Sequence, residues 1–248
     1  MTRWQKVGFR VFIAFFVLAV AFSYVVNSGL LEKSGKPWHM QPFVDEDSLS
    51  VSYMQKYSLL DKMPILSKVR DSSKATVVIL VDAWGVPFDE SQLEMDFAAF
   101  KDIPHKEYLH YRMANRTRHA ENAEYHHSDS SSVYLFGGDS LEYNRREYLP
   151  GLGFSQSIFC QNCGDEVMFA KLDSLLMERN STYVAMTTQD ARDGNREKLS
   201  GILTAIANLA KKHAEVQFII MGTHRPNLGE PEIRRIHYAH WVPVVVVR

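Results

Sequence analysis

The sequence predicts an α/β fold with a mainly parallel central sheet flanked by helices. Short apolar runs alternate along the chain with segments whose apolar residues recur at helical spacing. Such alternation is typical of right-handed crossovers that join parallel strands. Three of the runs, VVILV, FIIM and VPVVVV, lack the polar alternation of a half-exposed strand. They therefore predict strands that are covered on both faces.

Six strands and three helices are expected from these patterns. The strands are expected over residues 76–81, 107–112, 154–159, 182–187, 216–221 and 241–247. The helices are expected over residues 90–100, 166–179 and 198–213. A chain of 248 residues with 46% hydrophobic content can bury one sizeable core, and the apolar helix faces are interpreted as part of it.

The N-terminus has the pattern of a membrane anchor. Residues 11–26 carry no charge and follow three basic residues, Arg3, Lys6 and Arg10. The run is slightly shorter than the roughly 20 residues that span a bilayer, but flanking side chains and local thinning can compensate. Positive charge before the run predicts a single-pass protein whose C-terminal domain lies outside the cytoplasm. A signal peptide cleaved near residues 19–21 is the alternative, and it also predicts export.

Three regions are therefore expected along the chain. Residues 1–26 form a cytoplasmic tip and membrane anchor, residues 27–74 a juxtamembrane stalk, and residues 75–248 the α/β domain. The stalk segment mixes Gly, Ser, Lys and Pro without sustained periodicity. A net charge of −1 with interspersed signs lacks the basic stripe that nucleic-acid binding needs. The cell membrane is therefore an expected partner, whereas nucleic acid is not an expected partner.

The two cysteines of the chain, Cys160 and Cys163, form a CQNC motif. In an exported domain a pair with this spacing can close a small disulfide. The pair lies between an expected strand and an expected helix, so redox chemistry stays open beside a structural disulfide or free thiols. A four-cysteine zinc site is excluded, because the sequence has only these two cysteines.

Metal-competent side chains stand at the ends of three expected strands. Asp82 ends the run in VVILVDAWG, His224 follows the run in FIIMGTH, and His237 opens the segment HYAHWVPVVVV. Ligands of open α/β sheets collect beyond the carboxyl ends of the strands. An antiparallel last strand would bring its amino end to the same edge. We therefore expect Asp82, His224 and His237 to gather at one edge of the sheet.

Over residues 76–247 these segments, in order, resemble the alkaline phosphatase superfamily. The similarity rests on VVILVDAWG, RTRHAENAEY, GDEVMFAKLDSLL before TYVAMTT, FIIMGTH and HYAHWVP. That superfamily includes sulfatases, lipoteichoic acid synthases and phosphoethanolamine transferases. The resemblance implies an acidic metal ligand after the first strand, a hydroxyl or modified cysteine nucleophile, an Asp-His pair and a further histidine. It also implies a divalent metal, zinc or manganese, which activates the nucleophile and neutralises charge on the transferred group.

Carried over by position, the resemblance assigns the metal ligands first. Asp82 matches the first ligand and His224 the histidine of the Asp-His pair. His237 matches the further histidine, and His240 is the alternative. Two positions depart from the family: Thr223 stands where an aspartate precedes the histidine, and TYVAMTT is not followed by the usual histidine.

The nucleophile that the resemblance implies is Thr117. In RTRHAE this threonine is followed four residues later by Glu121, as in lipoteichoic acid synthases. The alternative is the serine cluster at 128 and 130–132, in which Ser130 is the first choice. The segment RHAENAEYHHSDS, which follows Thr117 and runs into the serines, is dense in histidine and glutamate: His119, Glu121, Glu124, His126 and His127. These side chains can bind zinc or manganese. The alternative is a polar loop in which they are solvated.

Two functions follow from the sequence. The first is a membrane-anchored, outward-facing, metal-dependent enzyme that transfers phosphoryl or sulfuryl groups of cell-envelope esters through Thr117. The second is a non-catalytic relative that keeps the sheet and binds envelope partners. Thr223 favours the second function, whereas the remaining histidines and hydroxyls favour the first.

Overall fold

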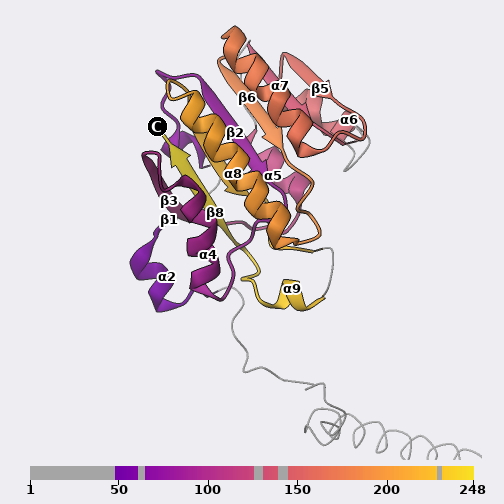
Figure 1. Cartoon of the computed structure of the whole chain (residues 1–248). Helices are drawn as coiled ribbons and strands as arrows, with labels where there is room; N and C mark the ends of the chain where they lie inside the picture. The colour runs from indigo at the N-terminus through magenta and orange to yellow at the C-terminus, as the bar shows by residue number, and fades with distance from the viewer. Residues whose placement is uncertain (1–47, 61–64, 126–130, 139–144, 228–230) are drawn as a thin grey trace, which may run out of the picture. The chain divides into compact units, whose positions relative to one another are not determined.

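The structure is a computed structural model that describes residues 48–60, 65–125, 131–138, 145–227 and 231–248 (Figure 1). The anchor expected at residues 11–26 lies outside these ranges. In the part of the chain that the structure describes, no helix is long and apolar enough to span a bilayer.

Within the described residues, eight strands form one sheet in the order β1-β3-β8-β7-β2-β6-β4-β5. Their pairings are parallel except for those of β8, which runs antiparallel to both β3 and β7. The mainly parallel sheet predicted from the sequence is thus confirmed, and the last strand is antiparallel, which brings its amino end to the carboxyl edge of the other strands. The strands are β1 Ser58–Leu60, β2 Thr76–Val81, β3 His105–Tyr111, β4 Ser132–Phe136, β5 Gln156–Phe159, β6 Tyr183–Thr187, β7 Gln217–Gly222 and β8 Trp241–Val247.

Helices cover both faces of this sheet. Alternate residues of β2 point to opposite faces, as the pleat of a strand requires. Val77 and Ile79 pack in the core beneath α4, α7 and α8, whereas Val78 and Leu80 pack beneath α3 and α5. Figure 1 shows α7 and α8 side by side in front of the sheet. The helices are α2 Val51–Lys56, α3 Leu66–Val69, α4 Glu90–Phe97, α5 Thr117–Glu124, α6 Arg145–Tyr148, α7 Asp165–Glu178, α8 Arg196–Lys212 and α9 Pro231–Arg235.

The sheet extends into the segment expected to be a stalk. Strand β1 pairs in parallel with β3, and Leu60 is buried in the core. Tyr53 of α2 is also buried, and its hydroxyl donates to the carbonyl of Pro87 at 2.7 Å. Elements of three and six residues are too short to show a period in the sequence. The α/β unit therefore includes residues 48–60.

Helix α5 and strand β4 are further elements that the sequence patterns did not predict. The core-facing residues of α5 are Thr117, Ala120, Glu121 and Glu124, three of them polar. An amphipathic pattern counts apolar residues, so a helix that buries a polar face escapes it. Strand β4 is fully buried but follows a run of serines that resembles a loop.

Candidate functional site

Three strand ends place polar side chains next to one another. Strand β2 lies between β6 and β7, so the residues that follow these parallel strands meet at the carboxyl edge of the sheet. Asp82 follows β2, Thr188 follows β6, and Thr223 follows β7. The backbone N–H of Asp82 donates to the Thr188 hydroxyl at 3.1 Å. This edge is the one at which the sequence predicts a site.

The loops after β2 and β7 are packed backbone against backbone. A Cβ atom at Gly222 would lie 1.8 Å from the carbonyl oxygen of Trp84, and one at Gly85 would lie 2.6 Å from Cα of Arg225. Only glycine permits such an approach at either position. The buried Trp84 indole fixes the first loop further by donating to Asp96 at 2.9 Å. Asp82 and Thr223 are thereby held in fixed relative positions.

Three residues converge on one oxygen of Asp82. The hydroxyls of Thr117 and Thr223 each donate to Oδ1 of Asp82 at 2.8 Å. Nε2 of His224 lies 3.3 Å from the same oxygen and 3.2 Å from Oγ1 of Thr117. Asp82, Thr117 and Thr223 are all buried. The structure therefore brings together three residues singled out in the sequence, Asp82, Thr117 and His224, and adds Thr223.

The ring of His224 is oriented by the loop that carries it. Its Nδ1 lies 2.6 Å from the carbonyl oxygen of Arg225 and 3.3 Å from the side-chain amide nitrogen of Asn227, and these contacts fix the ring. The other ring nitrogen, Nε2, then faces Asp82 and Thr117. Metal-binding histidines in proteins are commonly oriented by a carbonyl in this way.

The remaining donor set does not fit the divalent metal that the resemblance implies. Zinc sites in proteins use three or four His, Cys, Asp or Glu side chains. The described residues contain no group of three or more such side chains placed to hold a metal ion. The cluster has one carboxylate and one imidazole, and its other members are threonine hydroxyls that point their protons at Asp82. These protons occupy Oδ1 of Asp82, the carboxylate oxygen that also faces His224.

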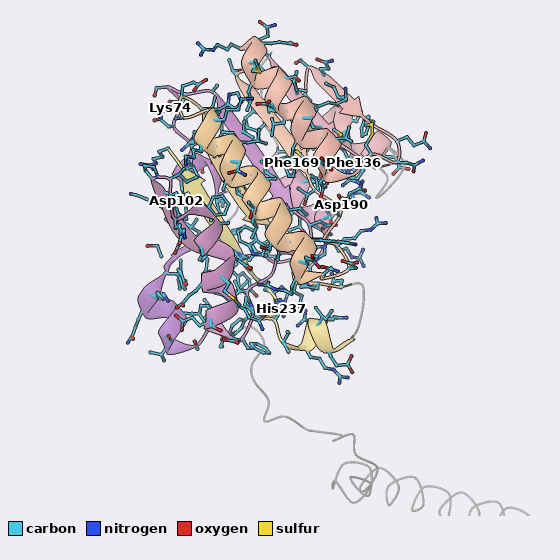
Figure 2. The ribbon with its side chains drawn as sticks, in the orientation of Figure 1. Lys74, Asp102, Phe136, Phe169, Asp190 and His237 are labelled. Atoms are coloured by element: carbon cyan, nitrogen blue, oxygen red, sulfur yellow. A yellow bond between two sulfur atoms is a disulfide. The ribbon has the colours of Figure 1, made fainter. Side chains whose placement is uncertain are left out.

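His237 lies at the same edge but is bonded elsewhere. Burial lowers the pKa of His237 to about 4, so its ring is neutral at pH 7. Its Nδ1 donates to the carbonyl of Ile233 at 2.7 Å, and its backbone forms a bridge with Pro87. Figure 2 labels His237 at the lower end of the domain, near α9. The alternative, His240, has Nδ1 2.9 Å from the carbonyl oxygen of Arg112.

The glutamates of the predicted His/Glu cluster form buried ion pairs. Glu121 accepts from Arg145 at 2.9 Å, from Thr187 at 2.6 Å, and from the hydroxyls of Tyr134 and Tyr148. Glu124 pairs with Arg112 at 3.2 Å and accepts from the backbone of Ile65. Both carboxylates anchor α5 instead of binding a metal or lining a solvated loop. His126, His127, Ser128 and Ser130 lie outside the described residues, and His119 is exposed.

Two carboxylates that the sequence did not predict to be neighbours, Asp165 and Asp190, lie beside the cluster. Asp165 begins α7 and accepts from the backbone N–H groups of Gln189 and Asp190. Asp190 accepts in turn from the backbone N–H of Asp165 at 2.8 Å. Burial raises the pKa of Asp165 to about 7, the charges of Asp190 and Asp82 act in the same direction, and the backbone donors oppose them. An Asp directly after a glycine at an expected helix start was the available signal.

A polar cavity of about 690 Å³ opens beside this pair. It lies at the carboxyl edge of the sheet, where the ends of β4 and β6 meet the starts of α7 and α8. Figure 2 labels Asp190, one of its lining residues. The others include Asn162, Cys163, Gln189, Arg192 and Lys198. The lining carries both charges and hydrogen-bonding groups, which suits a polar ligand.

Replacing Asp165 by Asn is expected to remove a pH dependence of stability. The folded-state pKa of about 7 lies above the ordinary value of 3.8, so the folded state binds the proton more tightly. The stabilisation is complete below about pH 4 and is lost as the pH rises to about 7. Urea unfolding at pH 4 to 8 measures the free energy of unfolding of the parent and of the variant. The parent value minus the variant value should fall as the pH rises through this window. Asp102→Asn, at an exposed position, is the control; a flat difference for Asp165→Asn would contradict the burial effect.

Comparison with known proteins supports the fold. The sequence matches no protein-family model and no curated protein. The structure is similar to a protein in the alkaline phosphatase superfamily from Vibrio parahaemolyticus, with a TM-score of 0.52 and 13% identity over 71% of this chain and 60% of that chain. The alkaline phosphatase-like fold predicted from the sequence is thereby confirmed.

Two further solved structures are similar at lower scores. Lipoteichoic acid synthase LtaP from Listeria monocytogenes gives a TM-score of 0.47 and 8% identity over 70% of this chain and 65% of that chain. The C-terminal periplasmic domain of EcEptC from Escherichia coli, in complex with Zn, gives a TM-score of 0.48 and 6% identity over 70% of this chain and 72% of that chain. This chain spans less than two thirds of the length of the Vibrio and Listeria proteins. At these identities the likeness concerns the fold alone.

Proposed function

We propose that this chain is a non-catalytic, metal-independent member of the alkaline phosphatase-like fold that binds polar material at the cell envelope. The observation that carries the proposal is the hydrogen bonding of Asp82. One oxygen of this carboxylate takes the hydroxyl protons of Thr117 and Thr223, where a catalytic centre would need a cation.

The charge of the cluster also opposes phosphoryl or sulfuryl transfer. Such transfer requires a nucleophile with a lowered pKa and neutralisation of the charge on the transferred group. Here the Thr117 hydroxyl is held by the buried side chain of Asp82, an acidic group that supplies no positive charge for a phosphate or sulfate ester. The cluster is suited to fixing the loops at the carboxyl edge of the sheet, not to stabilising an anionic transition state.

The proposed binding face is the cavity at the carboxyl edge of the sheet, next to the cluster. Its lining of amides, carboxylates, Arg192 and Lys198 suits neutral or zwitterionic polar groups better than apolar ones. The uncharged run at residues 11–26 supports a membrane anchor, and its basic flank supports placement of the domain outside the cytoplasm. Polar envelope material is then the ligand within reach.

A second candidate function is the metal-dependent transfer enzyme with Thr117 as nucleophile. One observation favours it: the Arg225 carbonyl orients His224 so that Nε2 faces both Asp82 and Thr117. If a metal were bound, Asp82, His224 and Thr117 would be the residues to hold it. It would lower the pKa of the hydroxyl and screen the charge of the ester.

Turnover of an activated aryl phosphate and an aryl sulfate, with and without zinc or manganese, separates the two candidates. We expect no turnover above that of the Thr117→Val and Asp82→Asn variants. Thr204→Val, on the exposed face of α8, is the matched threonine control. A turnover that both site substitutions abolish and the control keeps would establish the enzyme instead.

A further inference from the structure

We propose that the Cys160–Cys163 disulfide is redox-active and exchanges with a dithiol of a partner polypeptide. The two cysteines are joined in the structure, with their Cα atoms 5.4 Å apart. They close the loop between β5 and α7, at the same end of the sheet as the polar cavity.

The disulfide is accessible to an attacking thiol. Both cysteines are half-buried, and the two residues between them are exposed. Cys163 lines the polar cavity together with Asn162, and both cysteines also pack against the edge of the core. A thiolate must reach a sulfur atom along an open path, and the cavity beside Cys163 is the path that the proposal uses.

The position of Cys163 before a long helix favours its thiolate form. Helix α7 runs for 14 residues and begins at Asp165, two residues after Cys163. The positive end of the helix dipole stabilises a nearby thiolate and lowers its pKa. Cys160 lies three residues further from the helix start. Cys163 is therefore assigned as the attacking sulfur and Cys160 as the resolving one.

The loop is held by hydrogen bonds that do not depend on the sulfur–sulfur bond. Backbone N–H groups of Cys160 and Cys163 donate to the carbonyls of Phe136 and Gly137, each at 3.0 Å. The side-chain amide of Gln189 donates to the carbonyl of Cys163 at 2.9 Å. Asn162 adopts the left-handed conformation, with φ of 58°, that lets the turn reverse. The two sulfur atoms therefore stay close after reduction, which makes the bond readily reversible.

The bond contributes little to the stability of the fold, which is what a structural disulfide provides. It joins residues only three positions apart. The entropy that a cross-link removes from the unfolded chain grows with the length of the closed loop, so this loop gives a small stabilisation. An accessible bond with little structural effect is better suited to exchange than to stability.

The exchange transfers two electrons in two steps. A thiolate of the partner attacks Sγ of Cys163, which forms a mixed disulfide and releases Cys160 as a thiolate. The second thiolate of the partner then attacks the partner's first sulfur, which is bonded to Cys163 in the mixed disulfide. The partner's own disulfide forms, and Cys163 is released as a thiolate. The partner leaves as a disulfide, and its two protons end on Cys160 and Cys163. A partner disulfide is reduced by the same steps in reverse.

Glutathione serves as the probe in the test. The full chain is equilibrated in mixtures of reduced and oxidised glutathione and then alkylated. Mass spectrometry of the alkylated chain counts the free thiols. We expect a reversible change between zero and two thiols with an unaltered circular dichroism spectrum. With oxidised glutathione at pH 7, the Cys160→Ser variant should form a mixed disulfide at least ~10-fold faster than Cys163→Ser, because of the helix position.

Two results would overturn the assignment. One is that reduction of the parent chain occurs only under conditions that unfold it. The other is that both single variants react at the same rate, equal to that measured in urea. The parent experiment needs no substitution, so it decides the question even if a variant folds poorly.

Discussion

A Thr223→Asp variant is expected to bind zinc or manganese, whereas the parent chain is not. Oγ1 of Thr223 lies 2.8 Å from Oδ1 of Asp82, so the new carboxylate would face the old one at short range. Two carboxyl groups at this distance do not both ionise readily unless a cation lies between them. His224 and Thr117 stand beside the pair to complete a ligand set. The variant should therefore lose stability without metal and regain it when metal is added.

The expected gain follows from mass action. A metal that binds only the folded state stabilises it by about 2.7 kcal/mol at a concentration of 100 Kd. The measurement is the thermal unfolding midpoint with zinc, with manganese and with chelator, supported by calorimetric titration. Thr223→Asn is the matched control, since it has the shape of Asp without the charge. Equal metal responses of the Asp and Asn variants would show that the rest of the site cannot hold a metal.

Replacement of Glu121 by Gln is expected to destabilise the domain by about 3–5 kcal/mol. Glu121 is fully buried and is the ion-pair partner of Arg145, which is also fully buried. Without that carboxylate the guanidinium keeps its charge in a site closed to water. The free energy of unfolding in urea measures the loss. Because Glu121 lies one helical turn after Thr117, α5 should also lose its fixed position beside Asp82.

Two further variants make this prediction specific. Adding Arg145→Met to Glu121→Gln should recover part of the stability, because the unpaired buried charge is then removed. Lys212→Ala breaks an ion pair with Asp173 in which the lysine is half exposed. Its effect should stay within about 0.5 kcal/mol. Equal losses for Glu121→Gln and Lys212→Ala would mean that burial of the Glu121 pair has no energetic consequence.

The elements that the sequence predicts well are those whose cores are apolar. Strands β2 and β8 were expected over the residues they occupy, and α8 within two residues at its start and one at its end. Asp82 was singled out because it directly follows an apolar run, and His224 because it comes within three residues of the end of another. The antiparallel pairing of β8 with β7 is seen only in the structure, because an apolar run does not indicate the direction of its strand.

The parts that the sequence did not predict depend on polar contacts between distant residues. Helix α5 faces the core with Glu121 and Glu124, whose partners Arg145 and Arg112 lie 24 and 12 positions away. The role of Thr223 was also hidden, because its hydroxyl bonds a carboxylate 141 positions away. Such partners are set by the sheet order, which periodicity does not reveal.

Elemental analysis of the purified parent chain tests the central claim of metal independence most directly. The chain should be purified without chelator and compared with its Asp82→Asn variant. Far less than one equivalent of zinc or manganese in both, with an unfolding midpoint that chelator does not change, is the predicted result. One equivalent of metal in the parent chain that is lost in Asp82→Asn would contradict it.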